Sequence, residues 1–122
     1  MNQGRKISGG KYHARRKKKS FEKDSQGIKT SLRQTKRKTL RVMGGNKKTI
    51  LLSENKINLL DPKTNKTQRA EIKTVVETPQ NTFLARQNRL LKGAIIQTDK
   101  GKAKITNRPS QEGMVNAVLI SE

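Results

Sequence analysis

The sequence predicts a mainly β protein: a small six- to seven-stranded β-barrel with one short helical segment and a long basic N-terminal extension. Short stretches that alternate between apolar and polar residues, the period of a half-buried strand, recur from Thr39 onward. Turns rich in Gly, Pro and Asn separate these stretches. Residues 1–38 show no sustained hydrophobic period. We therefore divide the chain into a basic extension over residues 1–38 and a β-barrel domain over residues 39–122.

The first predicted element of the barrel is a hairpin. Apolar residues alternate over residues 39–42 and 48–52, and Gly44-Gly45-Asn46 stands between the two runs as a turn. Pro79 precedes good helix formers, which predicts one or two helical turns over residues 83–87. Further strands are expected at residues 56–60, 70–76, 94–98, 102–106 and 114–120. The last strand is almost wholly apolar, so we expect it to be buried on both faces or central in the sheet.

The charge balance of the chain indicates a polyanionic partner. Its 122 residues include 29 Lys and Arg against nine Asp and Glu, which gives a net charge of +20. The charge is densest over residues 11–19, where six cations fall within nine residues. Cations that leave water need a counter-charge, and the few acidic residues of the chain cannot supply it. A segment with this composition is expected to stay unfolded until it binds a partner.

The chain lacks the residues of common catalytic and metal sites. It contains no cysteine and a single histidine, His13, and its acidic residues are scattered without a spaced pair. We therefore expect no catalytic residue, no metal ligand and no cofactor, and the sequence does not predict an enzyme. No apolar run reaches the roughly 20 residues that span a bilayer, so no membrane contact is expected.

The aromatic content helps to choose between kinds of nucleic acid. Tyr12, Phe21 and Phe83 are the only aromatic residues, which argues against a stacking platform for single-stranded bases. No recognition helix for a DNA major groove is evident. Folded RNA, bound through its backbone and shape, fits these features best. Composition also permits a chromatin-type non-specific DNA-binding protein, and an RNA-processing enzyme is a weaker alternative.

The candidate RNA-binding residues are cations that contact phosphates and glycines that allow close approach of the backbone. In the extension they are Arg5, Lys6, Gly9, Gly10, Lys11, Arg15, Arg16, Lys17, Lys18 and Lys19. In the barrel domain they are Arg37, Lys38, Arg41, Gly44, Gly45, Lys47, Lys48 and Arg108. The basic run also fits a solvated tail or a nuclear-import signal. A plain hairpin turn is favoured over a phosphate cradle at Gly44-Gly45-Asn46.

The order and spacing of several motifs resemble the small-subunit ribosomal protein S-eight-e family of archaea and eukaryotes, in its archaeal form. The motifs are Gly4-Arg5-Lys6, Ser8-Gly9-Gly10, Arg41-Val42, Gly44-Gly45-Asn46-Lys47-Lys48, Asp61-Pro62-Lys63-Thr64, Val75-Val76-Glu77, Lys92-Gly93-Ala94-Ile95-Ile96, Gly101-Lys102-Ala103-Lys104-Ile105-Thr106, Arg108-Pro109 and Val115-Asn116-Ala117-Val118-Leu119-Ile120. The resemblance implies a structural constituent of the small ribosomal subunit, with a β-barrel body and an N-terminal arm that penetrates ribosomal RNA. It implies a cytoplasmic location in the ribosome, with ribosomal RNA and neighbouring ribosomal proteins as partners. A free homo-oligomer is not expected.

Overall fold

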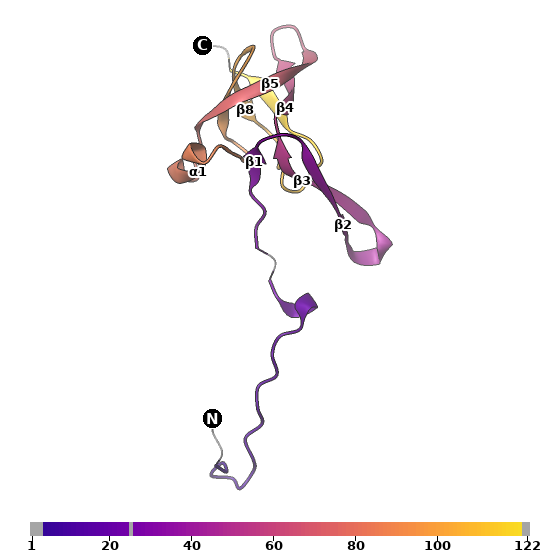
Figure 1. Ribbon diagram of the computed structural model, residues 1–122, viewed down its shortest axis with the longest axis vertical. Helices are drawn as coiled ribbons and strands as arrows, with labels where there is room; N and C mark the ends of the chain where they lie inside the picture. Colours follow the sequence, from indigo (N-terminus) through magenta and orange to yellow (C-terminus); the bar gives the residue numbers. More distant parts are fainter. Residues whose placement is uncertain (1–3, 25, 121–122) are drawn as a thin grey trace.

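The computed structural model describes residues 4–24 and 26–120, and within these ranges it is mainly β (Figure 1). In chain order the elements are η1 (Ser20–Glu22), β1 (Thr30–Leu32), β2 (Lys36–Arg41), η2 (Met43–Gly45), β3 (Lys47–Glu54), β4 (Lys56–Asp61), β5 (Lys66–Glu77), α1 (Thr82–Arg86), β6 (Arg89–Leu90), β7 (Ile95–Thr98), β8 (Gly101–Ile105) and β9 (Asn116–Leu119), where η denotes a 3-10 helix. The predicted fold class, a small β-barrel with one short α-helix, is confirmed.

Five strands close into the barrel, in the order β4-β5-β7-β8-β9. Neighbouring strands run antiparallel, except that β9 returns parallel to β4 and completes the ring. Each strand therefore has hydrogen-bonded neighbours on both sides. Closure removes the unpaired edges that short, apolar strands would otherwise expose to aggregation.

The other four strands form a second sheet in the order β2-β3-β1-β6. The predicted hairpin is present as β2 and β3, but it lies beside the barrel instead of within it. Five of the six residues of β2 are exposed. A strand with the sequence Lys-Arg-Lys-Thr-Leu-Arg cannot face a barrel interior, which explains why the barrel has five strands where the sequence predicted six or seven.

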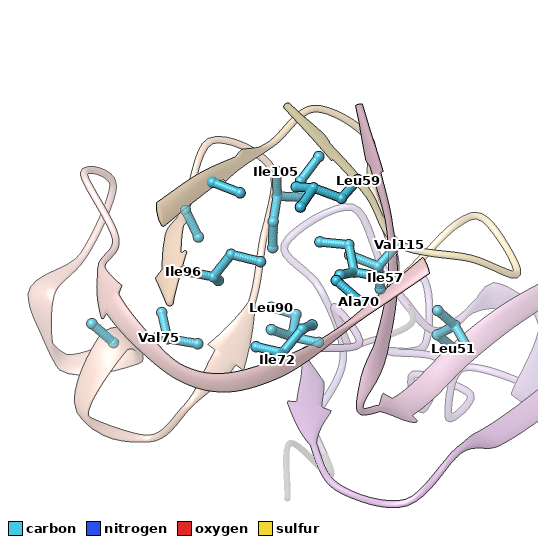
Figure 2. Packing of buried hydrophobic residues seen from close by; sticks show 14 residues of the cluster. Leu51, Ile57, Leu59, Ala70, Ile72, Val75, Leu90, Ile96, Ile105 and Val115 are labelled. Atoms are coloured by element: carbon cyan, nitrogen blue, oxygen red, sulfur yellow. The ribbon is translucent and has the colours of Figure 1, made fainter. Parts of the chain in front are cut away.

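Alternating apolar residues of the strands fill the barrel. On β4, Ile57 and Leu59 are buried while their neighbours are not, and on β8 Ala103 and Ile105 follow the same period. Figure 2 shows Ile57, Leu59 and Ile105 converging on one centre with Ile72 of β5 and Ile96 of β7, and Leu51 of β3 to one side of it. Large residues such as Ile96 share this centre with alanines, a mixture of sizes that suits a small barrel interior.

The long strand β5 bends around the barrel (Figure 2). Its pairing with β7 is shifted at two places, between Ile72 and Thr74 and between Val75 and Glu77. Such irregularities bend a strand and change which residues face inward. Ile72 and Val75, three positions apart, are both buried as a result. A strict two-residue period would have placed one of them outside.

Ordered strands begin at Thr30, earlier than the start near Thr39 that the alternation indicated. β1 pairs parallel with β3 and antiparallel with β6. Thr30 is fully buried, and its hydroxyl donates to the Leu51 carbonyl over 2.9 Å. A three-residue strand is too short to show a hydrophobic period. The division of the chain between residues 38 and 39 stays a prediction. The segment before this boundary contains β1 and the first half of β2.

The helix and the last strand meet the sequence expectations to different degrees. Helix α1 lies where the helical turns were predicted, and the Asn81 side chain caps it by accepting from the Phe83 N–H over 3.0 Å. Strand β9 is central, with hydrogen-bonded neighbours on both sides. Of the two expected alternatives, the central position is therefore the one that applies, since Val118 and Leu119 are half-buried and only Ala117 is buried within the strand.

Candidate nucleic-acid interface

Residues 4–24 form an arm that leads away from the barrel (Figure 1). We call this segment the arm. All of its candidate cations are exposed, and its apolar side chains are exposed as well, with Ile7 and Phe21 making no part of the core. Most of the arm is extended, and its one helical element is the 3-10 helix η1. The arm therefore presents cations without contributing to the packing of the barrel.

The tip of the arm is a closed turn. Arg5 and Lys11 form an isolated antiparallel bridge, and the Lys6 N–H donates to the Gly10 carbonyl over 2.8 Å. Gly9 has a φ of 81°, a left-handed conformation that the turn requires and that glycine adopts without strain. The Arg5 guanidinium also donates to the Gly9 carbonyl over 3.0 Å. The predicted glycine pair thus folds the tip back on itself and gathers three cations there.

Arg16 is the one predicted arm cation that is paired with an acid in the described part of the arm. Its guanidinium binds both carboxylate oxygens of Glu22, at 2.9 and 2.6 Å. The same carboxylate accepts from the Lys19 backbone N–H over 3.0 Å and so caps η1. The Arg16 hydrogen bonds, and then that of Lys19, lower the pKa of Glu22 below its ordinary value.

This contact is expected to depend on pH in a defined direction. Because the pKa of Glu22 is lower in the folded turn, the turn is stabilised above the ordinary glutamate pKa and loses this stabilisation as the pH falls through the lowered value. An NMR titration of the Lys19 amide proton should give a midpoint below that of an unstructured glutamate. Arg16→Gln should move the midpoint upward. A wild-type midpoint at or above the ordinary value would contradict the pairing.

The β2–β3 hairpin is a second cationic projection, which leaves the same end of the barrel as the arm but points in a different direction (Figure 1). Residues 29–53, which include it, hold eight Lys and Arg and no acid. β2 is an edge strand, and Arg41 lies directly opposite Lys47 in the register. Like charges at such positions repel each other and destabilise a hairpin. An anion placed between them would remove this repulsion.

The hairpin tip confirms the turn interpretation of Gly44-Gly45-Asn46. The Val42 N–H donates to the Asn46 carbonyl over 2.8 Å and closes the turn. Gly44 and Gly45 have φ values of 73° and 74°, where a residue with a Cβ atom would be strained. Contact of these glycines with a phosphate stays a prediction. Lys38, Arg41 and Lys47 are exposed and Lys48 is half-buried along the two strands.

Arg37 at the base of the hairpin lies beside a buried acid. Its guanidinium is 3.7 Å from a carboxylate oxygen of Glu54, whose side chain is almost wholly buried. The other oxygen of Glu54 accepts from the Thr35 hydroxyl over 2.6 Å and from the backbone N–H groups of Asn55 and Lys56. Arg37 still exposes about half of its side chain, at 55%. It is therefore oriented by Glu54 and open to a second anion.

Arg108 lies apart from the hairpin cations, on the exposed loop that follows β8. Among the exposed cations that sequence reasoning did not select are Lys36, Lys92 and Lys104. Lys36 belongs to the acid-free run of the hairpin, a signal that was available in the sequence. Lys104 lies four residues before Arg108, whereas Lys92 lies 16 residues before it, and the barrel brings all three to one cleft. The sequence alone does not indicate that Lys92 joins the other two.

No set of three His, Asp or Glu side chains comes together among residues 4–24 and 26–120 in a way that could hold a metal ion. The same residues include no helix long and apolar enough to cross a membrane. Titratable groups gather in ion pairs at two places in the described chain, Arg16 with Glu22 and Arg37 with Glu54. Neither place joins two acids or an acid and a histidine.

Fold and surface together define a class: small basic β-barrel proteins that carry a cationic, acid-poor extension. Comparison with known proteins places the chain within this class. The family model described as ribosomal protein S8e matches residues 1–120, so the chain belongs to that family. The family consists of structural ribosomal proteins and not of enzymes, which confirms that the chain is not an enzyme and leaves the RNA-processing alternative without support.

Three archaeal relatives, each named small ribosomal subunit protein eS8, illustrate the similarity. The protein of Methanococcus aeolicus is 48% identical over 119 residues, which cover 97% of this chain and 93% of the relative. That of Methanosarcina barkeri is 44% identical over 116 residues, covering 95% and 93%. That of Sulfurisphaera tokodaii is 43% identical over 122 residues, covering 99% and 95%. The family resemblance read from the sequence motifs is confirmed over nearly the whole chain.

Proposed function

We propose that this chain is a structural component of the small ribosomal subunit that binds folded ribosomal RNA and stabilises its fold. The arm and the β2–β3 hairpin make the contacts, and the barrel holds both in place. Its partners are ribosomal RNA and neighbouring ribosomal proteins in the cytoplasmic ribosome, and it does not act as a free homo-oligomer. The observation that carries the proposal is the exposure of two cationic segments with little counter-charge of their own.

The physical task of these segments is to offset repulsion between phosphates. RNA helices that approach each other in a compact fold bring their charged backbones together, and lysine and arginine placed between them lower that repulsion. Such contacts position a protein without reading sequence. The exposed aromatic residues Tyr12 and Phe21 each lie beside a lysine, with the ring centroid 5.9 Å from the ammonium nitrogen. They are too few to form a stacking surface, which favours recognition of folded RNA by its backbone and shape.

A competition experiment tests this proposal against a chromatin-type DNA-binding function. The full-length protein is bound to a labelled transcript of archaeal small-subunit ribosomal RNA and challenged with unlabelled transcript or with duplex DNA of equal phosphate number. We expect the folded RNA to compete at least about tenfold better, because non-specific attraction to phosphates is common to both polymers and the fitted shape is not. Equal competition by duplex DNA would overturn the proposal in favour of non-specific DNA binding.

A further inference from the structure

A cleft on the barrel, outside the arm and the hairpin, combines three cations with no acid. It has a volume of about 640 Å³. Lys92, Lys104 and Arg108 line it, together with the polar residues Gln80, Ser110 and Gln111. The three cations come from different elements: the segment before β7, strand β8 and the loop after β8. We call this site the Lys92 cleft.

The cations of the Lys92 cleft have no counter-charge within the described chain. None of its lining residues is acidic, and none of its three cationic side chains makes a hydrogen bond or ion pair to any residue in the ranges 4–24 and 26–120. Glu112, the acid nearest to Arg108 in sequence, accepts instead from the Asn107 amide over 2.8 Å. Three unpaired cations facing one concave space repel each other unless an anion enters it.

Two other basic clefts in the described part of the molecule lack this property. One is lined by Arg37, Lys56 and Arg69 but also by the carboxylate of Glu54. The other contains lysines beside Asp61. In both clefts a carboxylate balances part of the positive charge, so the electrostatic attraction for an incoming anion is weaker. Among these three basic clefts the Lys92 cleft therefore has the strongest attraction for an anion.

The backbone around the Lys92 cleft is held in place before any ligand arrives. The Gln80 amide donates to the Lys92 carbonyl over 2.6 Å. The Pro109 carbonyl accepts from the Leu51 N–H of β3 over 3.1 Å, and the Arg108 carbonyl accepts from the Gln111 N–H over 3.0 Å. Pro109 is among the fully buried residues. Sites with a preformed backbone lose less entropy when they bind.

From these observations we infer that the Lys92 cleft binds a phosphodiester group of the folded RNA, as a third contact in addition to the arm and the hairpin. The three cations neutralise the phosphate, and the Ser110 hydroxyl and the Gln111 amide supply directional donors to its oxygens. The inference rests on the proposed function, since it takes the same RNA as ligand. The concave shape selects a point where the RNA backbone turns outward, and a cleft of this volume accommodates the adjoining sugar.

The first test compares two variants that lose the same charge. Lys92→Gln/Lys104→Gln/Arg108→Gln removes the cations of the cleft, and Lys63→Gln/Lys66→Gln/Lys73→Gln removes three exposed lysines elsewhere on the barrel domain. Binding to archaeal small-subunit ribosomal RNA is measured over a series of salt concentrations. We expect the cleft variant to bind at least about tenfold more weakly with a salt slope about 0.7–0.9 shallower, and the control to lose no more than about threefold.

Equal losses in the two variants would overturn the inference, because only the net charge would then matter. If the cleft variant bound as the wild type does, the cleft would also be excluded while the proposed function stood. If the wild type itself failed to bind the RNA, the proposed function would fall instead. Thermal unfolding of each variant, compared with wild type, shows whether the substitutions preserve the fold. If the cleft variant does not fold, Arg108→Lys takes its place, because it keeps the charge of the side chain but loses the forked donors.

A second test locates the RNA directly and does not depend on affinity. The chain has no cysteine, so Glu112→Cys, at an exposed residue next to the cleft that does not line it, introduces a single attachment point for a tethered iron chelate that cleaves nearby RNA backbone. We expect cleavage confined to one short stretch of the RNA from Glu112→Cys, and none from Lys73→Cys on the exposed part of β5. Absence of cleavage from Glu112→Cys in a complex that still forms would overturn the inference.

Discussion

Removing residues 1–26 is expected to leave a folded barrel whose affinity for the RNA is at least about 100-fold weaker at about 0.15 M salt. The deletion removes nine Lys and Arg together with two acids, Glu22 and Asp24. It spares Ile28, whose side chain is half-buried. It also spares Lys29, whose backbone carbonyl accepts a hydrogen bond from the Arg89 guanidinium over 3.0 Å. If the arm neutralises about eight phosphates, the slope of log K against log salt should become shallower by about 6.

A longer deletion, of residues 1–35, is the informative comparison. It also removes β1, with the buried Thr30 hydroxyl bond and the bond from the Leu32 N–H to the Asn88 carbonyl. We expect it to lower the free energy of unfolding by about 2–4 kcal/mol, whereas the shorter deletion should change that free energy by less than about 0.5 kcal/mol. Urea unfolding of both truncations measures the difference. An unfolded product from the shorter deletion would show that the arm contributes to the fold.

The fold was predictable wherever a strand was long enough to show its period. Residues 56–60 and 102–106 alternate clearly, and both are strands of the barrel. β1 and β6, with three and two residues, carry no such signal. Their place depends on pairing with β3 and with each other, which are contacts between distant parts of the chain. Local pattern also could not separate the hairpin from the barrel, because the exposure of β2 follows from tertiary arrangement.

The candidate interface was predictable to the extent that charge is dense in sequence. The arm and the hairpin are rich in cations and poor in acids, and their candidate cations lie exposed, except for the half-buried Lys48. The pairing of Arg16 with Glu22 depends on the extended path between them and was not foreseen. The Lys92 cleft joins Lys104 and Arg108, which are four residues apart, to Lys92, which precedes β7. The spacing of these residues in the sequence does not show that the barrel brings Lys92 to the other two.

Glu54→Ala is expected to lower the free energy of unfolding by about 2–3 kcal/mol, the largest effect of any single acidic residue in the described chain. One oxygen of this nearly buried carboxylate accepts from the Thr35 hydroxyl, just before β2, and from the Asn55 and Lys56 N–H groups, where β4 begins. The other lies near Arg37. Glu54 therefore joins the base of the hairpin to the first strand of the barrel, and alanine leaves these donors without their acceptor.

Two further variants separate the hydrogen bonds of Glu54 from its charge. Glu54→Gln keeps an oxygen acceptor but no longer attracts Arg37, so its loss of stability should fall between wild type and alanine. Glu71→Ala removes an exposed acid from β5 and should change the free energy of unfolding by less than about 0.5 kcal/mol. Urea unfolding measures all three, and amide hydrogen exchange along β2 should accelerate in Glu54→Ala as the hairpin base loosens. Equal stability of Glu54→Ala and Glu71→Ala would mean that the hairpin is held to the barrel by apolar packing and backbone pairing alone.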